Sequence, residues 1–469
     1  MLDKTLTCGK CANYHSTSGM IAVSDVGDNG DWFGSTIKNS FNEKKYNSIN
    51  DINCGGPQTG YANIRMYVNN GQKETVAHSC LTKLKDNSNF VLMKNTLVKN
   101  IIISKSDKGI VTVNGVNVHT SEADCSDFSI TANHEIILSA GAESTAKILL
   151  QSGIGRAKDL CPNTKQVLDL NVGYNRIDHI RTVHFYIIPE SNNPPEVQIV
   201  NVTARLAAKS EKYLKERKGY YSTFDRSNLQ LAVNLHNKSS AHPDIIYNFM
   251  QYDQCTPEFN MTCKNYGYKQ EFCDQLYRAN QYYSLLVVTS TLQEPKSSGT
   301  VKLGSCCDPL AYPTINTNYL TEQHDIEMLI KGIEELNEFM NTTTMINNGV
   351  KDLMINITEC NAFKRNSEDY YRCYIKYFSN GDNNVCGTAK MGRYYDKDAV
   401  VDYKMRVMNV TKYPNTANLR IVDASIFPTI TMGNSPCVSF AVAEKAADLI
   451  INDRLPKYSE ERRRNRRDF

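Results

Sequence analysis

Two segments near the C-terminal end of the chain carry the residue types best suited to chemistry. They are NNVCGTAKMG at 383–392 and LRIVDASIFPTITMGNSPCVSFAVAEKAADLI at 419–450. In the second, an apolar run ends at Asp423, and a turn at Gly433-Asn434-Ser435 leads into an apolar helix. A helix N-terminus presents free N–H groups and suits an anionic group. The simpler interpretation is a helix capped by Asn434 or Ser435, with Pro436 in its first turn.

Two earlier segments also combine glycine with polar residues, SAGAESTAKILLQSGIG at 139–155 and NVGYNRIDH at 171–179. For His15 and His179, both a functional role and a buried structural role are open. We expect Asp178 to pair with backbone or a neighbour, and Cys386 to be packed rather than reactive. We find no Ser/His/Asp nucleophile elbow and no His-Glu-x-x-His pair. We predict no metal site.

Together these segments resemble the glucose–methanol–choline (GMC) flavin oxidoreductases, of the insect glucose dehydrogenase and ecdysone oxidase type. The stretch 139–155 resembles the second GMC signature, with Thr145-Ala146 where Ser-Pro is usual. The motif at 173–179 is similar to the family's GxNLxDH, and PKSSGTV at 295–301 is similar to PKSRGTV. Segments 308–320 and 325–336 also fit, so the resemblance runs from about Tyr14 to Asp448.

The resemblance implies FAD as cofactor and a CH–OH donor as substrate, namely an alcohol, sugar or steroid hydroxyl that gives a hydride to the flavin. Carried over position by position, Asn384 and Asn434 form the catalytic pair. The residues that the resemblance places along the flavin are Asp423, Ala424 and Ser435, with Leu97 near its adenosine end.

Two departures from the family pattern shape the functional expectation. No GxGxxG unit for the FAD pyrophosphate precedes Tyr14, so we expect weak or absent FAD binding by this chain alone. The family's catalytic His position holds Asn384, and His324 is the last histidine. An amide cannot act as general base, which typically costs about 10²–10⁴ in rate. The leading interpretation is an impaired oxidoreductase. The alternatives are a non-catalytic, truncated binding protein and half of a split enzyme whose FAD cradle comes from a second chain.

Length and charge exclude several other classes. With 469 residues the chain has room for two or three domains, and it lacks the run of about 18 apolar residues that a membrane helix needs. The net charge is +3 and equals that of the tail at 457–469. The remainder is neutral, so we do not expect nucleic acid as a partner. We expect a small-molecule hydroxyl substrate, and a disordered basic tail.

The cysteines bear on the compartment. There are 15, and several cluster: Cys255, Cys263 and Cys273; Cys306 and Cys307; Cys360 and Cys373. Such clusters suit local disulfides in an oxidising compartment. The N-terminus has no apolar signal segment, so localisation stays open, with an extracellular site suspected from the family and the cysteines.

The elements that position these residues can be expected from periodicity. We predict strands within 86–140 from NFVLMKN, VKNIIIS, IVTVNGVNV and HEIILSA, with turns at 107–109 and 114–115. We predict helices over 143–151, 324–341 and 436–451. The expected buried side of the last helix comprises Val438, Ala441, Val442, Ala446, Leu449 and Ile450. We expect residues 195–280 to be irregular.

The predicted fold is mixed α/β, with a discontinuous, N-terminally truncated GMC-type flavin domain and a substrate domain of antiparallel sheet plus helices. The expected segments are a connecting segment bordering the substrate cavity (1–85), flavin-domain parts (86–181 and 380–456), a substrate domain (182–379) and the tail (457–469). The family resemblance implies this layout.

Overall fold

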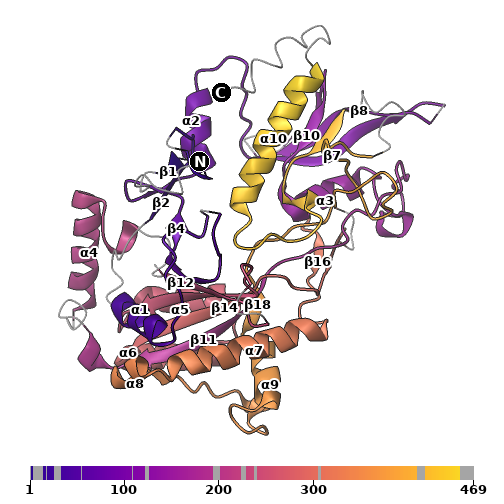
Figure 1. Cartoon of the computed structure of the whole chain (residues 1–469). Helices are drawn as coiled ribbons and strands as arrows, with labels where there is room; N and C mark the ends of the chain where they lie inside the picture. Colours follow the sequence, from indigo (N-terminus) through magenta and orange to yellow (C-terminus); the bar gives the residue numbers. More distant parts are fainter. Residues whose placement is uncertain are drawn as a thin grey trace. The chain divides into compact units, whose positions relative to one another are not determined.

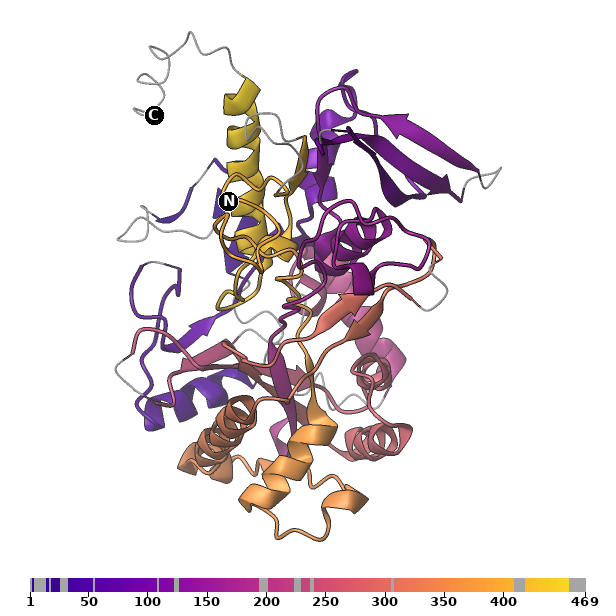
Figure 2. The same cartoon turned by 90° about the vertical axis from the view of Figure 1, so that its right-hand side faces the viewer.

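The computed structural model describes residues 2–3, 14–16, 18–25, 33–53, 55–107, 109–121, 126–193, 201–222, 229–236, 240–304, 308–408 and 418–454. The predicted basic tail and the pair Cys306-Cys307 lie outside these ranges. The chain forms two compact units (Figures 1 and 2). Unit 1 comprises 1–91, 180–293 and 322–380, and unit 2 comprises 92–179, 294–321 and 381–469. The predicted mixed α/β class is confirmed.

Unit 1 is built on a seven-stranded sheet in the order β17-β11-β14-β13-β12-β3, with β18 also paired to β11. The long strands in the middle are antiparallel and hydrogen-bonded over most of their length. Every residue of the central strand β14 is buried, including the four Ser and Thr residues of its sequence SLLVVTSTL. The strand bounds are β3 Gly60–Asn63, β11 Ile180–Ile188, β12 Leu229–Val233, β13 Ile245–Tyr252, β14 Ser284–Leu292, β17 Lys351–Asp352 and β18 Ser379–Gly381.

Helices cover one face of this sheet. In α1 (Gly34–Glu43), the Phe41 ring packs edge-on against Phe249 of β13 and at a tilt against Phe339 of α7 (Gln323–Met340), with ring centroids 5.4 and 5.1 Å away. The Tyr247 hydroxyl, also from β13, donates to a carbonyl of α7 at 2.7 Å. All three phenylalanines are essentially buried, and each contributes about 1.5–3 kcal/mol to stability. The helix predicted at 324–341 is thereby confirmed.

Within 195–280, the described residues 201–222, 229–236 and 240–280 are mostly in helices and strands, so the expectation of irregular structure is wrong for them. This region contains α4 (Val202–Glu216), α5 (Pro257–Asn265) and α6 (Gln270–Tyr282), besides β12 and β13. The polar sequence did not indicate a helix at α4, because α4 is amphipathic and Arg205 is the only one of its residues that is buried. A disulfide between Cys263 and Cys273 joins α5 to α6, as the clustering predicts.

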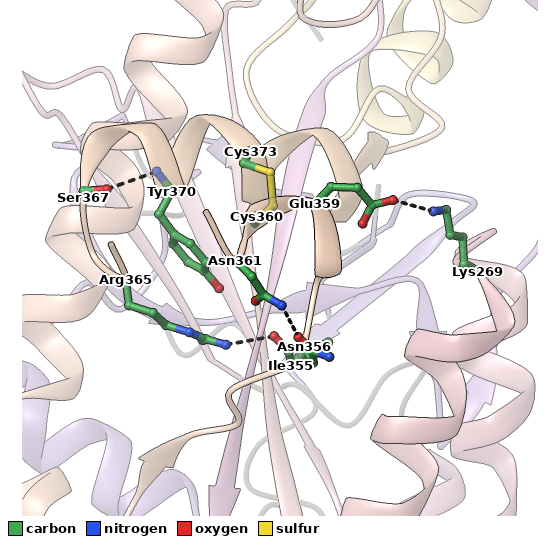
Figure 3. The surroundings of a disulfide bond; sticks show 10 residues. All are labelled: Lys269, Ile355, Asn356, Glu359, Cys360, Asn361, Arg365, Ser367, Tyr370 and Cys373. Carbon is green, nitrogen blue, oxygen red and sulfur yellow. Dashed lines mark hydrogen bonds and ion pairs between the residues drawn. A yellow bond between two sulfur atoms is a disulfide. The ribbon is translucent and has the colours of Figure 1, made fainter. Parts of the chain in front are cut away.

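A second disulfide joins Cys360 to Cys373 in α9 (Glu368–Phe378), again as predicted (Figure 3). The Ser367 side chain caps α9 by accepting from the Tyr370 N–H at 3.3 Å. The preceding loop is held by a hydrogen bond from Arg365 to the Ile355 carbonyl at 3.0 Å. Both disulfides therefore close short loops around helices of unit 1.

Unit 2 contains an antiparallel sheet of β7 (Thr96–Lys105), β8 (Val111–Thr120) and β9 (Asp127–Thr131). The predicted turn at 114–115 is wrong, because both residues lie inside β8, where the register with β7 skips Asn114 as a bulge. Glycine is needed there, since a Cβ on Gly115 would lie 2.2 Å from the Ile130 carbonyl oxygen. The predicted strand at 89–95 is also not formed, and β9 was not expected.

The remaining long elements of unit 2 match expectation more closely. β10 (Ile136–Leu138) pairs in parallel with β19 (Leu419–Ile421) and leads into α3 (Gly141–Gln151). The predicted helix at the C-terminal end is α10 (Pro436–Arg454). Its Val438, Val442 and Leu449 pack on the core and Ala446 is buried, but Ala441 is exposed, contrary to expectation.

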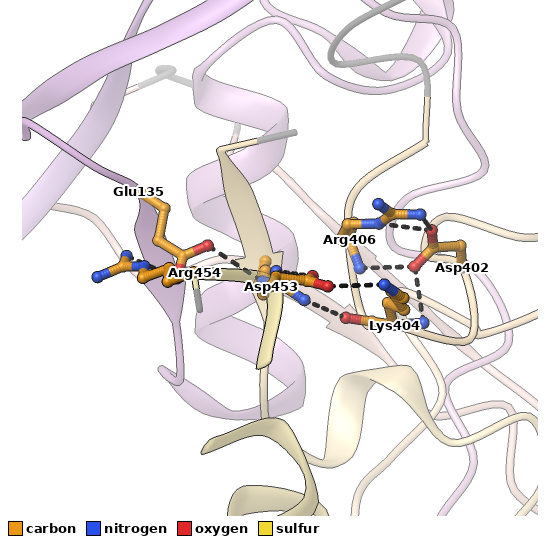
Figure 4. Close-up of polar contacts among 7 residues, drawn as sticks. Glu135, Asp402, Lys404, Arg406, Asp453 and Arg454 are labelled. Atoms are coloured by element: carbon orange, nitrogen blue, oxygen red, sulfur yellow. Dashed lines mark hydrogen bonds and ion pairs between the residues drawn. The ribbon is translucent and has the colours of Figure 1, made fainter. Parts of the chain in front are cut away.

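The C-terminal end of α10 is fixed by charges (Figure 4). Arg420 of β19 is 3% exposed and donates to Glu135 at 3.1 Å and to Asp453 of α10 at 2.8 Å. Lys404 also reaches Asp453 at 2.7 Å, and Arg454 reaches Glu135 at 3.0 Å (Figure 4). These ion pairs tie the last turn of the helix to the parallel strand pair.

Shorter elements complete the two units. They are β1 Leu2–Asp3, β2 Ala22–Asp25, β4 Arg65–Met66, β5 Val68–Asn69, β6 Gln72–Lys73, η2 Ala77–Leu81, α2 Thr82–Leu84, η3 Ala157–Asp159, η4 Glu190–Asn192, η5 Tyr220–Ser222, β15 Thr300–Lys302, β16 Thr314–Asn316, α8 Thr343–Asn347, η6 Thr358–Cys360 and η7 Ala424–Ile426. Within the described ranges, no helix has the length and apolar character needed to cross a bilayer.

Candidate active site

Asn384 is the centre of a polar cluster in unit 2. It is 4% exposed, and its backbone N–H donates to Asp178 Oδ1 at 2.7 Å. Its side-chain Oδ1 accepts from the backbone N–H of Ser435 at 3.0 Å and from the Ser435 hydroxyl at 3.2 Å. Ser435 directly precedes the first residue of α10. The start of this helix is thus bound by an amide from a distant segment of the chain.

The other end of the Asn384 side chain faces two further polar groups. Its Nδ2 lies 3.4 Å from Asn434 Oδ1 and 3.3 Å from Asp382 Oδ2, and it also donates to the Asp382 carbonyl at 3.2 Å. The two residues predicted as the catalytic pair, Asn384 and Asn434, therefore touch. Asp382, half-buried beside them, was not among the predicted site residues.

A buried acid stands behind this cluster. Asp178 is 3% exposed, and its Oδ2 accepts from the Tyr319 hydroxyl at 2.7 Å. Arg176 donates to Glu143 at 2.9 Å and to the Tyr319 oxygen at 3.4 Å. Burial, followed by the charge of Asp178, raises the pKa of Tyr319 to about 12, so it stays a neutral donor. The expectation that Asp178 pairs with backbone or a neighbour is confirmed.

The approach of the chain to this acid requires glycine. A Cβ on Gly381 would lie 2.3 Å from Asp178 Oδ2 and 2.1 Å from the Tyr319 hydroxyl oxygen. The next residue, Asp382, donates its N–H to the His179 carbonyl at 3.0 Å. The backbone of 381–384 is therefore held by the close packing of Gly381 and by the hydrogen bonds of the Asp382 and Asn384 N–H groups.

Of the residues predicted along a flavin, Asp423 has the most contacts. Its Oδ1 accepts from the Ser425 N–H at 2.8 Å, and its Oδ2 accepts from Gly141 N at 3.0 Å and from the Thr145 hydroxyl at 2.6 Å. It thus joins η7 to the start of α3. The Ala424 carbonyl accepts from Gly387 N at 3.1 Å.

The other residues singled out from the sequence differ in how far their side chains are exposed to solvent. Leu97 of β7 is 44% exposed. Cys386 is fully buried, and burial, followed by the charge of Asp178, raises the pKa of its thiol to about 12, so it is packed rather than reactive, as expected. His179 is 1% exposed. His15, in unit 1, pairs with the buried Asp51 at 2.7 Å.

The loop before α10 has features that suit a ligand. Gly433 has φ +70°, and a Cβ there would meet no atom within 4 Å. The hydroxyl oxygen of Thr431 is buried without a hydrogen-bond partner within the described part of the chain. This loop therefore combines open space with an unsatisfied polar group.

Unit 1 has a separate collection of polar side chains, on the sheet face opposite α7. Residues paired across neighbouring strands share a face, and Gln230, Asn248 and Thr289 form one such row. In the next row Thr291 pairs with Arg181. Thr289 and Thr291 are each 3% exposed, and the Thr291 hydroxyl has no hydrogen-bond partner among described residues.

The same face is apolar further along the strands. Beyond the polar rows it carries Met250, Val287 and Phe185, and then Tyr252, whose ring lies 4.7 Å from Phe259 of α5. The face is thus divided into an apolar part that packs on helices and a polar part at the start of β11. No metal site accompanies these groups: across the described ranges, no three His, Cys, Asp or Glu side chains are placed to bind one.

Comparison with known proteins identifies the family. Residues 39–181 and 295–443 match the N- and C-terminal profiles described as GMC oxidoreductase, and together the matches cover more than half the chain. The chain belongs to the GMC oxidoreductase family. The resemblance found in the sequence motifs is therefore confirmed.

Curated relatives agree. The chain is 28% identical to the ecdysone oxidase of Bombyx mori over 448 residues, which is 93% of this chain and 60% of that protein. It is 27% identical to the glucose dehydrogenase [FAD, quinone] of Drosophila melanogaster, covering 93% and 64%. The chain thus spans less than two thirds of the length of these relatives.

Solved structures share the fold. An FAD-dependent oxidoreductase from Chaetomium thermophilum superposes with a TM-score of 0.74 at 18% identity, over 94% of this chain and 75% of that one. A formate oxidase variant from Aspergillus oryzae gives a TM-score of 0.75 at 20% identity, over 94% and 74%. FAD is accordingly the cofactor of the family to which this chain belongs.

Proposed function

We propose that this chain forms the substrate-facing part of an FAD-dependent GMC oxidoreductase acting on the CH–OH group of an alcohol, sugar or steroid. The observation that carries the proposal is the contact between Asn384 and Asn434 at the start of α10. In this proposal unit 2 belongs to the flavin domain and unit 1 to the substrate domain. The two amides hold the substrate hydroxyl in place.

The open loop before α10 supports the cofactor part of the proposal. The space over Gly433 and the Thr431 hydroxyl, which has no partner among the described residues, fit a planar group with hydrogen-bonding edges. When bound, FAD supplies the acceptor for the hydride. Ser435, Asp423, Ala424 and Leu97 are the residues that we propose to lie along it. Asp423 acts by holding η7 and α3 together, because its carboxylate already binds protein donors.

Taken by itself, unit 1 also offers groups that suit a ligand with hydroxyl groups, on the polar rows of its sheet. Asn248 and Gln230 supply both donors and acceptors, and the Thr291 hydroxyl has no partner among described residues. A purely apolar ligand would leave these groups without hydrogen bonds, which costs about 1–3 kcal/mol each. A substrate with hydroxyl groups would satisfy them.

A second candidate is a binding protein without catalysis, or half of an enzyme completed by another chain. The hydrogen bonds of Asn384 favour it, since its N–H, Oδ1 and Nδ2 all have partners within unit 2. In the family pattern this position is a histidine that accepts a proton. We also propose an extracellular location, supported by the Cys263–Cys273 and Cys360–Cys373 disulfides.

The test measures FAD binding and turnover with one pair of matched variants. Gly433→Val fills the space before α10. Gly267→Val is the control, because Gly267 also has a positive φ (+72°) and a Cβ there would also meet no atom within 4 Å. Because weak FAD binding is expected of this chain alone, FAD is titrated at high protein concentration. We expect weak quenching of FAD fluorescence by the wild type and by Gly267→Val, and none by Gly433→Val. Alcohol-dependent dye reduction should follow the same order.

Two outcomes would contradict the proposal. Equal quenching by both variants would show that FAD does not use this loop. Binding of an alcohol or sugar without any FAD binding would favour the non-catalytic alternative.

A further inference from the structure

Oxidation of an alcohol by hydride transfer also releases the proton of the hydroxyl group. In this chain the position of the family's histidine is Asn384, and a neutral amide does not accept a proton at useful pH. If the proposed function holds, another group in the cluster must receive it. The following inference rests on that proposed function.

Among the described residues, four carboxylates lie in the cluster or on the segments joined to it, and their surroundings differ. Glu143 accepts hydrogen bonds from Nε and Nη2 of Arg176. Asp178 is buried, and both of its oxygens accept hydrogen bonds from protein donors. Asp423 binds η7 and the start of α3 with both oxygens. Asp382 is only half-buried and places Oδ2 against Asn384 Nδ2 at 3.3 Å. Asp382 is thus the acid best placed to exchange a proton with a ligand at the two amides.

The position of Asp382 is well defined. The preceding residue, Gly381, packs against Asp178 and Tyr319. The N–H of Asp382 itself donates to the His179 carbonyl. Asn384 Nδ2 then bridges Asp382 Oδ2 and Asn434 Oδ1, which are 3.3 and 3.4 Å from it. A hydroxyl held by the amides would therefore lie within reach of the carboxylate. The charged groups on neighbouring segments are Asp178, Arg176 and Glu143, with Tyr319 as a neutral donor.

We propose that Asp382 is the proton acceptor of this chain and takes the role that histidine has in the family pattern. The O–H bond of the alcohol breaks and its proton forms a new O–H bond with the Asp382 carboxylate. The carbinol C–H bond breaks and its hydrogen leaves with both bonding electrons to an oxidised flavin, which is reduced. The alcohol becomes a carbonyl compound, and the Asp382 proton returns to water.

The first experiment compares pH profiles of alcohol-dependent dye reduction by the FAD-loaded chain. With a carboxylate as acceptor, the rate should rise with pH near the usual Asp range of about 4 and be level at pH 6–7. Asp382→Asn should lower the rate by about 10²–10⁴. The control Asp107→Asn, in the exposed turn after β7, should not change it. Adding Asn384→His to Asp382→Asn should restore turnover, with a new rise at about pH 6–7.

The second experiment does not depend on flavin. In protein labelled with ¹⁵N at asparagine, the side-chain amide signal of Asn384 is assigned by its loss in Asn384→Ala. Because its Nδ2 contacts Asp382, this signal should shift with pH as one carboxylate titrates. The shift should be absent in Asp382→Asn and present in Asp107→Asn.

The outcomes separate the two claims. If the wild type does not bind FAD or turn over alcohol, the proposed function fails and the role of Asp382 with it. If it does both and Asp382→Asn is as active as the wild type, only the role of Asp382 fails. A wild-type rate that rises at pH 6–7, or an Asn384 amide that does not respond to Asp382, would likewise overturn that role.

Discussion

Replacing Asp178 by alanine should destabilise unit 2 strongly. The side chain is 3% exposed and accepts two hydrogen bonds of 2.7 Å, from the Asn384 N–H and the Tyr319 hydroxyl. Its removal leaves both donors without an acceptor in a buried site.

The size of the effect follows from these contacts. Each hydrogen bond to a charged group contributes about 1.5–3 kcal/mol, and breaking a buried charged network costs about 3–5 kcal/mol. We therefore expect Asp178→Ala to lower the free energy of unfolding by about 3–5 kcal/mol. Tyr319→Phe removes one of the two donors and should cost about 1.5–3 kcal/mol.

A double-mutant cycle tests whether the two side chains act together. Once Asp178 is gone, Tyr319→Phe removes a hydroxyl without its acceptor, so the double variant should lose less than the sum of the single losses. The expected coupling is about 1–3 kcal/mol. Urea unfolding followed by circular dichroism measures it, and amide exchange at Asn384 reports the same contact locally. Tyr312→Phe is the control, since Tyr312 is 93% exposed. Additive losses, or a loss below about 1 kcal/mol for Asp178→Ala, would refute the reasoning.

Three further perturbations have defined outcomes. Thr291→Val removes a buried hydroxyl that has no partner among described residues and should raise the free energy of unfolding by about 1 kcal/mol; a fall would show that the hydroxyl is bonded in solution. Replacing Cys360 and Cys373 together by serine opens a bridge with a sequence separation of 13 and should cost about 3 kcal/mol in thermal or urea unfolding, whereas Cys80→Ser, at a free cysteine, should change little. Hydrogen bonds from the N–H groups of Thr344 and Thr343 lower the pKa of Glu43 from 4.5 to about 2. The ionised carboxylate therefore stabilises the folded state above pH 4.5, and this stabilisation is lost as the pH falls towards 2. Glu43→Gln should remove that part of the acid dependence, and an unchanged unfolding profile against pH would contradict it; exposed Glu216→Gln is the control.

Local patterns predicted the elements whose signal is contained in a short stretch. The helix at 324–341 was predictable because apolar residues recur every three or four positions and one side packs on the sheet. The two disulfides were predictable because each pair is close in sequence. The turn at 114–115 was wrong because Asn-Gly also suits a bulge, and the close approach of Ile130 decides between them. That approach depends on β9, which the sequence analysis did not expect.

The candidate site was predictable only in part, for a similar reason. Asn384 and Asn434 were found through motif positions, and the structure brings them into contact. Asp382 belongs to no motif, and its role is visible only once its carboxylate is seen against the Asn384 amide. The polar sheet rows were missed because Gln230, Asn248 and Thr289 come from separate strands, and only the register aligns them.

The two ends of α10 should respond differently to ionic strength. Its start is bound by uncharged groups, the Asn384 amide and Ser435, whose hydrogen bonds are little affected by salt. Its last turn is bound by ion pairs among Arg420, Asp453 and Glu135, with Lys404 and Arg454 at their solvent side. At 1 M salt the screening length falls to about 3 Å, which weakens the outer pairs first. High salt should therefore fray this helix from its C-terminal end while its first turn, beside the two asparagines, keeps its geometry.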